Sequence, residues 1–231
     1  MNKRKKRTQN GCILVFCAHN DDQVIGAGGT LAKYAKQGKQ FFTYIFSYGE
    51  SSHPHLKRKV TIEMRVKESL EADKVLGGSG IVYFGISEGR FNEEIAEKGI
   101  EQKIRDIIKE KNPEKIFTHS IDDPHPDHKA VYYLIKKIVD DIDFRGDVYS
   151  FDIWNPIQIR KRNLPKLVVD ISETFSTKIR AFRCHRSQKV TMIVLMWNVY
   201  LKALFNGFYN HVRYAEVFSN CLLYTSPSPR D

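Results

Sequence analysis

Short apolar runs alternate with amphipathic segments along the chain from residue 12 onward. The run at residues 12–18 is continuous, apolar and β-branched-rich, which is typical of a strand that is covered on both faces. Further strands are predicted at residues 41–47, 81–85, 115–119, 147–154 and 166–172. Helical periodicity fills the intervals at residues 28–38, 61–78, 92–112 and 128–142, and a final apolar helix follows residue 188. This alternation predicts a single α/β domain with a Rossmann-like, doubly wound, mostly parallel sheet and helices on both faces.

The length and composition of the chain fit such a domain. A chain of 231 residues with 42% hydrophobic content is long enough for one sizeable core. No stretch reaches the roughly 20 uninterrupted apolar residues of a membrane span; the closest, MIVLMWNVYLKALF, is broken by Asn198 and Lys202. The first residues lack the apolar stretch of a signal peptide, so we expect a cytoplasmic protein. Cys12, Cys17 and Cys184 have no CxxC spacing, which favours reduced thiols.

The N-terminal end differs from the rest of the chain in charge. Of the formal net charge of +10, five positive charges lie in residues 3–7, and we expect residues 1–10 to form a basic disordered arm. No aromatic residue interleaves with these charges to stack on bases, which argues against a nucleic-acid partner. Membrane contact by the arm is disfavoured because stable attachment generally takes two signals. Deletion of residues 2–7 is therefore expected to leave turnover unchanged.

The C-terminal end differs from the rest of the chain in its sequence. Residues 221–231 read CLLYTSPSPRD, which resembles a translated sequencing adapter and is excluded from the native protein. Residues 11–220 remain as the expected folded domain. Their pattern does not indicate an oligomeric state.

Two polar clusters follow predicted strands: AHNDDQ follows the first strand, and THSIDDPHPDH contains the end of the fourth. Ligands of doubly wound sheets bind outside the carboxyl ends of the strands, so the two clusters should converge. His19 and Asp22 are three residues apart, as are His125 and His128, and each pair can face one point. Zinc enzymes use three protein ligands and an open position. We predict His19, Asp22 and His128 as the zinc ligands, which leaves Asp21 and His125 free for catalysis.

These residues resemble the signature of the LmbE-like or PIG-L de-N-acetylases, A-H-P-D-D-E followed later by H-P-D-H. The similarity continues in RVKESLEADKVLG, which resembles the R-x-x-E helix of the family, in VDIS, HRSQ and YAEVF, and covers nearly all of residues 12–218. The resemblance implies a zinc-dependent hydrolase, with one zinc per chain, that removes an N-acetyl group from an N-acetylglucosamine-type sugar or glycoconjugate.

The resemblance also implies a role for each residue of the site. Asp21 is the general base, and His125 stabilises the tetrahedral intermediate or protonates the leaving amine. Arg65 is a candidate for binding a hydroxyl or phosphate of the small-molecule substrate. Two positions depart from the signature: Asn20 replaces proline and Gln23 replaces glutamate. We expect Asn20 to keep the turn through its own side-chain hydrogen bonds, and Gln23 to alter a contact around the metal or the affinity for it.

The remaining histidines are less informative. His53 and His55 are expected to be solvated loop residues. His119 and His185 fit either a structural role or a place near the site, and HRSQ, which contains His185, belongs to the segments that resemble the family.

Two other classes of function compete with the hydrolase. IGAGG after a strand suggests a nucleotide-binding Rossmann protein, but carboxylates occupy the turn where a pyrophosphate would approach the backbone. A non-catalytic sugar-binding homologue is the other alternative, because Gln23 departs from the signature.

Overall fold

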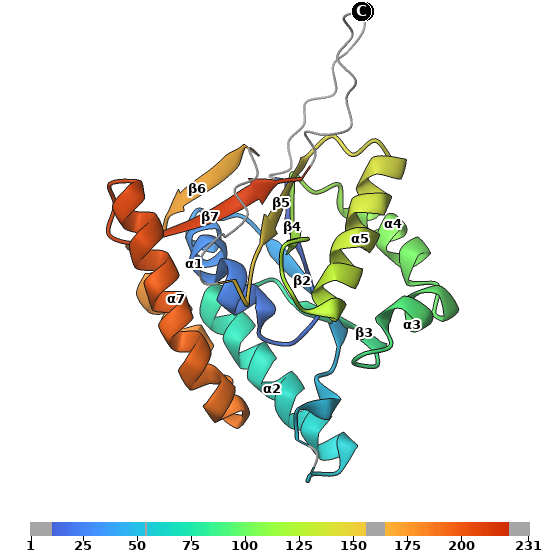
Figure 1. Ribbon diagram of the computed structural model, residues 1–231. Coiled ribbons are helices and arrows are strands. Elements are labelled where there is room, and N and C mark those ends of the chain that lie inside the picture. The colour runs from blue at the N-terminus through green and yellow to red at the C-terminus, as the bar shows by residue number, and fades with distance from the viewer. Residues whose placement is uncertain (1–10, 54, 156–164, 222–231) are drawn as a thin grey trace, which may run out of the picture.

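The computed structural model describes residues 11–53, 55–155 and 165–221. The described strands form one sheet in the order β3-β2-β1-β4-β5-β7-β6 (Figure 1). These strands are β1 (Ile13–Cys17), β2 (Phe41–Ser47), β3 (Ile81–Ile86), β4 (Lys115–His119), β5 (Asp147–Phe151), β6 (Lys166–Asp170) and β7 (Ala215–Asn220). The pairs from β3 to β5 are parallel, and β7 runs antiparallel to both of its neighbours. The predicted fold class is confirmed.

Helices cover both faces of the sheet (Figure 1). One face packs against α1 (Asp22–Lys36), α2 (Arg58–Leu76), α6 (Phe175–Phe182) and α7 (Lys189–Tyr209), and the other against α3 (Phe91–Glu97), α4 (Ile100–Lys111) and α5 (Pro126–Asp141). The apolar run of β1 is continuous because both faces of this strand are buried. Val15 and Cys17 pack into the core on one face of the sheet, and Leu14 and Phe16 pack into the core on the other. Two short 3-10 helices, η1 (Glu50–Ser52) and η2 (Arg186–Gln188), lie in the connections.

Three expectations from the sequence need correction. The helix predicted at residues 92–112 is two helices, because Gly99 adopts a left-handed conformation (φ 59°) and caps α4. Helix α1 begins at Asp22 instead of Gly28, so the polar turn is already helical where a loop was expected. The segment YAEVF contributes to β7, a strand that the pattern of apolar runs did not predict.

The order of the strands positions the two polar clusters. From β1 the chain builds outward through β2 and β3, and then returns to place β4 on the other side of β1. Such a switch point opens a crevice at the carboxyl ends of β1 and β4, where these folds bind ligands. The polar turns that follow β1 and β4 meet there. The expected arm and all but the first residue of the expected adapter segment lie outside the described residues.

Candidate active site

The turn between β1 and α1 places His19 and Asp22 together. The backbone N–H of His19 donates to Oδ2 of Asp22 (N···O 2.7 Å), which closes the turn. Asp22 is the first residue of α1 and is 2% exposed. The dipole of a helix stabilises a carboxylate in its first turn, so α1 stabilises the buried negative charge of Asp22.

The turn between β4 and α5 presents the second pair of histidines. His125 caps α5, and its Nδ1 accepts the backbone N–H of Asp127 (3.2 Å). Pro126 occupies the first turn, where its missing N–H costs nothing. His128 follows in the same turn and is almost fully buried. Its ring points toward Asp22, at the turn that follows β1.

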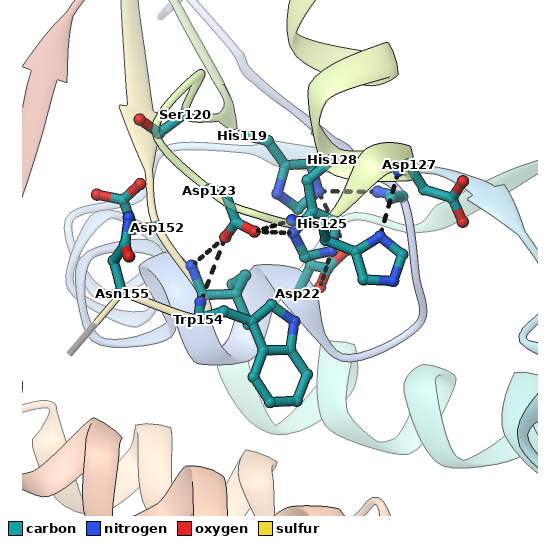
Figure 2. A network of polar contacts seen from close by, with 12 residues as sticks. Asp22, His119, Ser120, Asp123, His125, Asp127, His128, Asp152, Trp154 and Asn155 are labelled. Carbon is teal, nitrogen blue, oxygen red and sulfur yellow. Dashed lines mark hydrogen bonds and ion pairs between the residues drawn. The ribbon is translucent and has the colours of Figure 1, made fainter. Parts of the chain in front are cut away.

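The three residues predicted as metal ligands come together (Figure 2 shows Asp22 and His128). Nδ1 of His19 lies 3.1 Å from Nε2 of His128 and 3.6 Å from Oδ2 of Asp22. Nε2 of His128 lies 3.5 Å from Oδ1 of Asp22. Tetrahedral ligands at the roughly 2.0–2.1 Å typical of zinc are about 3.3 Å apart. Taken pair by pair, these separations are close to that spacing, but the two contacts of Asp22 run to different oxygens of its carboxylate. The assignment of His19, Asp22 and His128 as the zinc ligands therefore stays a prediction.

A carboxylate lies beside the far nitrogen of each predicted histidine ligand. Nδ1 of His128 lies 2.9 Å from Oδ1 of Asp123 (Figure 2). Nε2 of His19 lies 3.3 Å from Oδ2 of Asp127. Histidines that bind metals are commonly oriented in this way by a carboxylate on the other nitrogen. Neither aspartate was predicted. Their signal was present in DDPHPDH, where they flank the two histidines.

The pKa values of the three predicted ligands depend on burial, which disfavours the charged form, and on the charges of their neighbours. Despite burial, contacts with Asp127 and Asp22 raise the pKa of His19 to about 10. Burial and the neighbouring His119 lower the pKa of His128. Burial alone raises the pKa of Asp22, but His128 and His119 hold it well below its usual range. Asp22 and His128 are thus in the protonation states that a metal requires of its ligands, whereas a metal would have to displace the proton that the neighbouring carboxylates hold on His19.

His119 belongs to this cluster but is placed as a support. Two overlapping groups have ligand atoms within 4.8 Å of one another: one joins His19, His125 and His128, and the other joins Asp22, His119 and His128. The ring of His119 stacks on His128 at 3.9 Å, and its Nε2 accepts the N–H of Ala18 (3.0 Å). A lone pair engaged in this way is not free for a metal. The same Nε2 also lies 3.1 Å from Oδ2 of Asp22, so His119 is best assigned to the support of Asp22 and His128.

Comparison with known proteins assigns the chain to a family. The profile of the PIG-L family, described as GlcNAc-PI de-N-acetylase, matches residues 14–139, which is more than half of the chain. The chain belongs to the PIG-L family. The matched span contains both turns of the cluster.

Relatives of the chain carry more than one activity in their names. It is 28% identical over 207 residues to a 4-oxalmesaconate hydratase of Pseudomonas putida, covering 81% of this chain and 78% of that protein. It is 27% identical over 195 residues to a probable N-acetyl-α-D-glucosaminyl L-malate deacetylase 2 of Bacillus cereus, covering 78% and 85%. The N,N'-diacetylchitobiose deacetylase structure from Pyrococcus horikoshii shares the fold, with a TM-score of 0.74, 24% identity, and coverage of 95% and 88%.

The positions where the chain departs from the PIG-L signature are buried beside the cluster. The side-chain amide of Asn20 donates to the hydroxyl of Tyr83 (3.2 Å), whereas the turn itself is closed by Asp22. The expectation that Asn20 holds its own turn is therefore wrong. Gln23 is fully buried, and neither atom of its side-chain amide has a hydrogen-bond partner among the described residues.

The R-x-x-E helix of the family contacts the cluster through α2. Arg65 is 3% exposed, and its Nη2 lies 3.8 Å from Oδ2 of Asp21. One turn later, Glu68 accepts both the N–H and the hydroxyl of Ser187 at 2.7 Å, which ties HRSQ to α2. The residue predicted to bind substrate thus lies against the residue predicted to be the base.

The other histidines are placed as follows. His53 is half-buried and its Nε2 contacts the carbonyl of Ser187 (3.1 Å), so it was wrongly expected to be solvated, while His55 is exposed. His185 is buried, and burial lowers its pKa to about 4 although Asp21 acts in the opposite direction. Neither ring nitrogen of His185 has a hydrogen-bond partner among the described residues.

Proposed function

We propose that the protein is a zinc-dependent hydrolase that removes the N-acetyl group from an N-acetylglucosamine-type sugar or glycoconjugate and releases acetate and a free amine. Membership of the PIG-L family and relatives named as sugar deacetylases support this activity. One observation carries the proposal. The near nitrogens of His19 and His128 face each other and Asp22, while carboxylates contact their far nitrogens.

His19, Asp22 and His128 would hold the metal. When bound there, zinc supplies a Lewis acid that makes water more acidic and polarises a carbonyl group. Three protein ligands leave a position for water and substrate. The buried walls of the cluster keep bulk water out, which strengthens every charge interaction in it.

Asp21 is proposed as the general base. It takes a proton from the attacking water while the water oxygen forms a bond to the acetyl carbon. Its neighbour in sequence, Asp22, points toward the histidines, which leaves Asp21 on the side of Arg65. Adjacent carboxylates in one turn can therefore divide the two tasks.

His125 is proposed to donate a hydrogen bond to the carbonyl oxygen and to assist the departure of the leaving nitrogen. Because its Nδ1 accepts the N–H of Asp127, the proton of the neutral ring sits on Nε2, which becomes a donor. Burial, together with His19 and His128, lowers the pKa of His125 and favours the neutral form. A fixed donor of this kind stabilises the developing oxyanion. The C–N bond then breaks, and a proton delivered to nitrogen releases the amine.

Arg65 is proposed to position the base and to bind a polar group of the substrate. Its contact with Asp21 supports the first role. The second role rests on Nε of Arg65, which is buried without a hydrogen-bond partner among the described residues. A hydroxyl or phosphate oxygen is the kind of acceptor that this N–H suits.

Hydration of a carbon–carbon double bond is the second candidate function. The similarity to a 4-oxalmesaconate hydratase covers as much of the chain as the similarity to the deacetylases, and an activated water serves both reactions.

Incubation of the zinc-loaded protein with a panel of N-acetylglucosaminides tests the choice. Acetate and free amine in equal amounts support the deacetylase. Hydration of an unsaturated oxo-dicarboxylate without any acetate release supports the hydratase. Metal binding without either turnover indicates a non-catalytic homologue.

A further inference from the structure

Helix α7 presents a broad apolar face to solvent. Figure 1 shows α7 at the edge of the molecule, with one side toward the sheet and the other outward. Its inward side is buried through residues such as Leu195 and Val199. Its outward side carries large apolar residues that are 44–78% exposed. We call this set the apolar face: Ile193, Trp197, Leu201, Leu204, Phe205 and Phe208.

The size of the apolar face sets it apart from ordinary surface residues. Trp197, Phe205 and Phe208 alone expose roughly 300–500 Å², since an aromatic side chain offers about 150–250 Å². The largest apolar patch on a typical monomer is about 300–600 Å², and three aliphatic side chains extend this one further. Residues four apart keep the patch on one side of the helix. Such a surface usually marks a binding site.

A cluster of unpaired basic residues lies beside the apolar face. An open cavity of about 730 Å³ is bounded by α6, α7 and the end of α1, and Tyr200 of α7 forms part of its wall. Its charged lining consists of one acid, Glu173, and the basic rim: Lys36, Arg180, Arg183 and Arg213. The four basic side chains are exposed, and none has an ion-pair partner among the described residues. Helix α7 itself contains no Asp or Glu.

We propose that the apolar face of α7 and the basic rim together bind the surface of an anionic phospholipid membrane. Helices at membrane interfaces place Trp, Phe and Leu among the acyl chains and basic residues among the headgroups. Each basic residue near an anionic surface contributes roughly a fivefold gain in binding. No helix among the described residues is long and apolar enough to cross a membrane, so α7 would lie in the plane of the interface.

A second copy of the chain is a poorer occupant of this surface. A twofold interface would bring two basic rims to the edges of one contact. Like charges opposed in this way weaken association, and α7 offers no carboxylate to balance them. An anionic bilayer suits both surfaces, because its acyl chains contact the apolar face and its headgroups contact the basic rim. The apolar face of α7 is also the second signal for membrane attachment that the basic arm lacks.

Co-sedimentation with vesicles tests the proposal. The full chain is expected to bind vesicles of phosphatidylcholine mixed with phosphatidylglycerol, and to bind pure phosphatidylcholine far less. Replacing two exposed aromatic residues (W197S/F208S) should lower binding at least about tenfold. Tyr133→Ser, an exposed aromatic residue on α5, is the matched control and should bind normally.

The basic rim is tested with R180Q/R183Q/R213Q against K103Q/K109Q on α4. The first variant is expected to bind anionic vesicles at least about tenfold more weakly, and the second to differ little. Thermal melting of every variant checks the fold. Turnover of a water-soluble substrate should stay unchanged, because none of these residues belongs to the cluster.

Fluorescence and sedimentation velocity complete the test. The chain has two tryptophans, so Trp154→Phe leaves Trp197 as the reporter, and its emission should shift to the blue with anionic vesicles. Three outcomes overturn the proposal. They are no binding to anionic vesicles, binding that W197S/F208S leaves unchanged, and a dimer that the same variant dissociates while vesicles are ignored.

Discussion

Two buried clusters of charged side chains contact helix α1, and they differ in how fully their polar atoms are hydrogen-bonded. In the first, Glu216 accepts the N–H groups of Gly29 and Thr30 (3.0 and 2.7 Å). Lys178 donates to Glu216 (2.6 Å) and to the carbonyl of Ile25 (2.7 Å). The ion pair is therefore closed, since each charge is matched within the protein and also anchors the backbone of α1.

The second cluster, at the N-terminus of α1, is left open. Both side-chain amide atoms of Gln23, Nδ1 of His119, Nε of Arg65 and both ring nitrogens of His185 are buried without a hydrogen-bond partner among the described residues. Buried polar atoms are normally paired, so several orphans in one place indicate something that the chain itself does not supply. The difference is the one expected between a structural ion pair and the metal and substrate site proposed above.

The largest loss of zinc binding and turnover is expected from a substitution in the second cluster. Replacing His128 with alanine should abolish zinc binding and turnover, because two ligands cannot hold the ion in an open site. Metal analysis of the purified variant measures this, with a normally loaded Tyr133→Ser protein as the control. Full zinc content in the His128 variant would place the metal elsewhere.

Asp21→Asn should separate metal binding from catalysis. The variant is expected to keep its zinc and to lose about 10²–10⁴-fold in turnover, the usual contribution of a general base. Paired measurements of zinc content and of acetate release check both parts. If zinc is lost together with turnover, the roles assigned to Asp21 and Asp22 are reversed.

The first cluster should behave in the opposite way. Lys178→Met leaves Glu216 buried without its cation and should lower the free energy of unfolding by about 3–5 kcal/mol, with zinc still bound by the folded fraction. Denaturant unfolding measures the loss. The double variant K178M/E216L should recover much of it, because an apolar pair leaves no charge unmatched. A loss of zinc from folded Lys178→Met protein would show that the two clusters are coupled.

Asp123 offers a smaller and more specific test of the metal site. Its carboxylate orients His128 and also accepts the N–H of Ile153 (2.8 Å). Asp123→Asn is expected to weaken zinc binding by about 10–100-fold, as is usual when such a supporting carboxylate is changed. A competition titration with a chelator gives the affinity. Asp147→Asn, at the start of β5, should leave it unchanged.

Asp73 in α2 sharpens the comparison, because it is a buried carboxyl group outside both clusters that contacts the backbone of Gly80. Burial raises its pKa to about 6, and its Oδ1 has no partner among the described residues. A carboxyl group with a folded-state pKa above its unfolded value destabilises the fold when ionised. The cost is therefore absent below the unfolded pKa of about 4, grows between about pH 4 and 6, and is complete above about pH 6. Asp73→Asn should therefore raise the free energy of unfolding by about 1–2 kcal/mol at pH 7–8 and by little near pH 4. Unfolding curves at the two pH values test this, and equal gains at both would exclude titration as the cause.

Much of the fold was predictable because its strands are short, largely apolar segments that alternate with helical periodicity. β1, β2 and β4 lie at or within one residue of the predicted segments. Boundaries failed where one residue changed the backbone: Gly99 divides a helix that apolar periodicity joined. β7 was missed because its sequence, AEVFSN, is short, partly polar and lacks a continuous apolar run.

For the site, spacing and strand ends were enough to bring the two turns together. The sequence could not show which groups contact one another across them. The contacts of Asp123 with His128 and of Arg65 with Asp21 depend on how separate elements pack. The broken apolar segment in α7 was considered only as a membrane span, whereas its exposure depends on which side of the helix meets the sheet.

The most direct test of the central claim is a zinc titration of chelator-treated protein, followed by acetate release from an N-acetylglucosaminide. The account predicts no release from the metal-free protein and a rise that saturates at one zinc per chain, with no recovery in His128→Ala. Release from metal-free protein at the full rate, or zinc binding by the native chain that produces no acetate from any N-acetylglucosaminide, would contradict it.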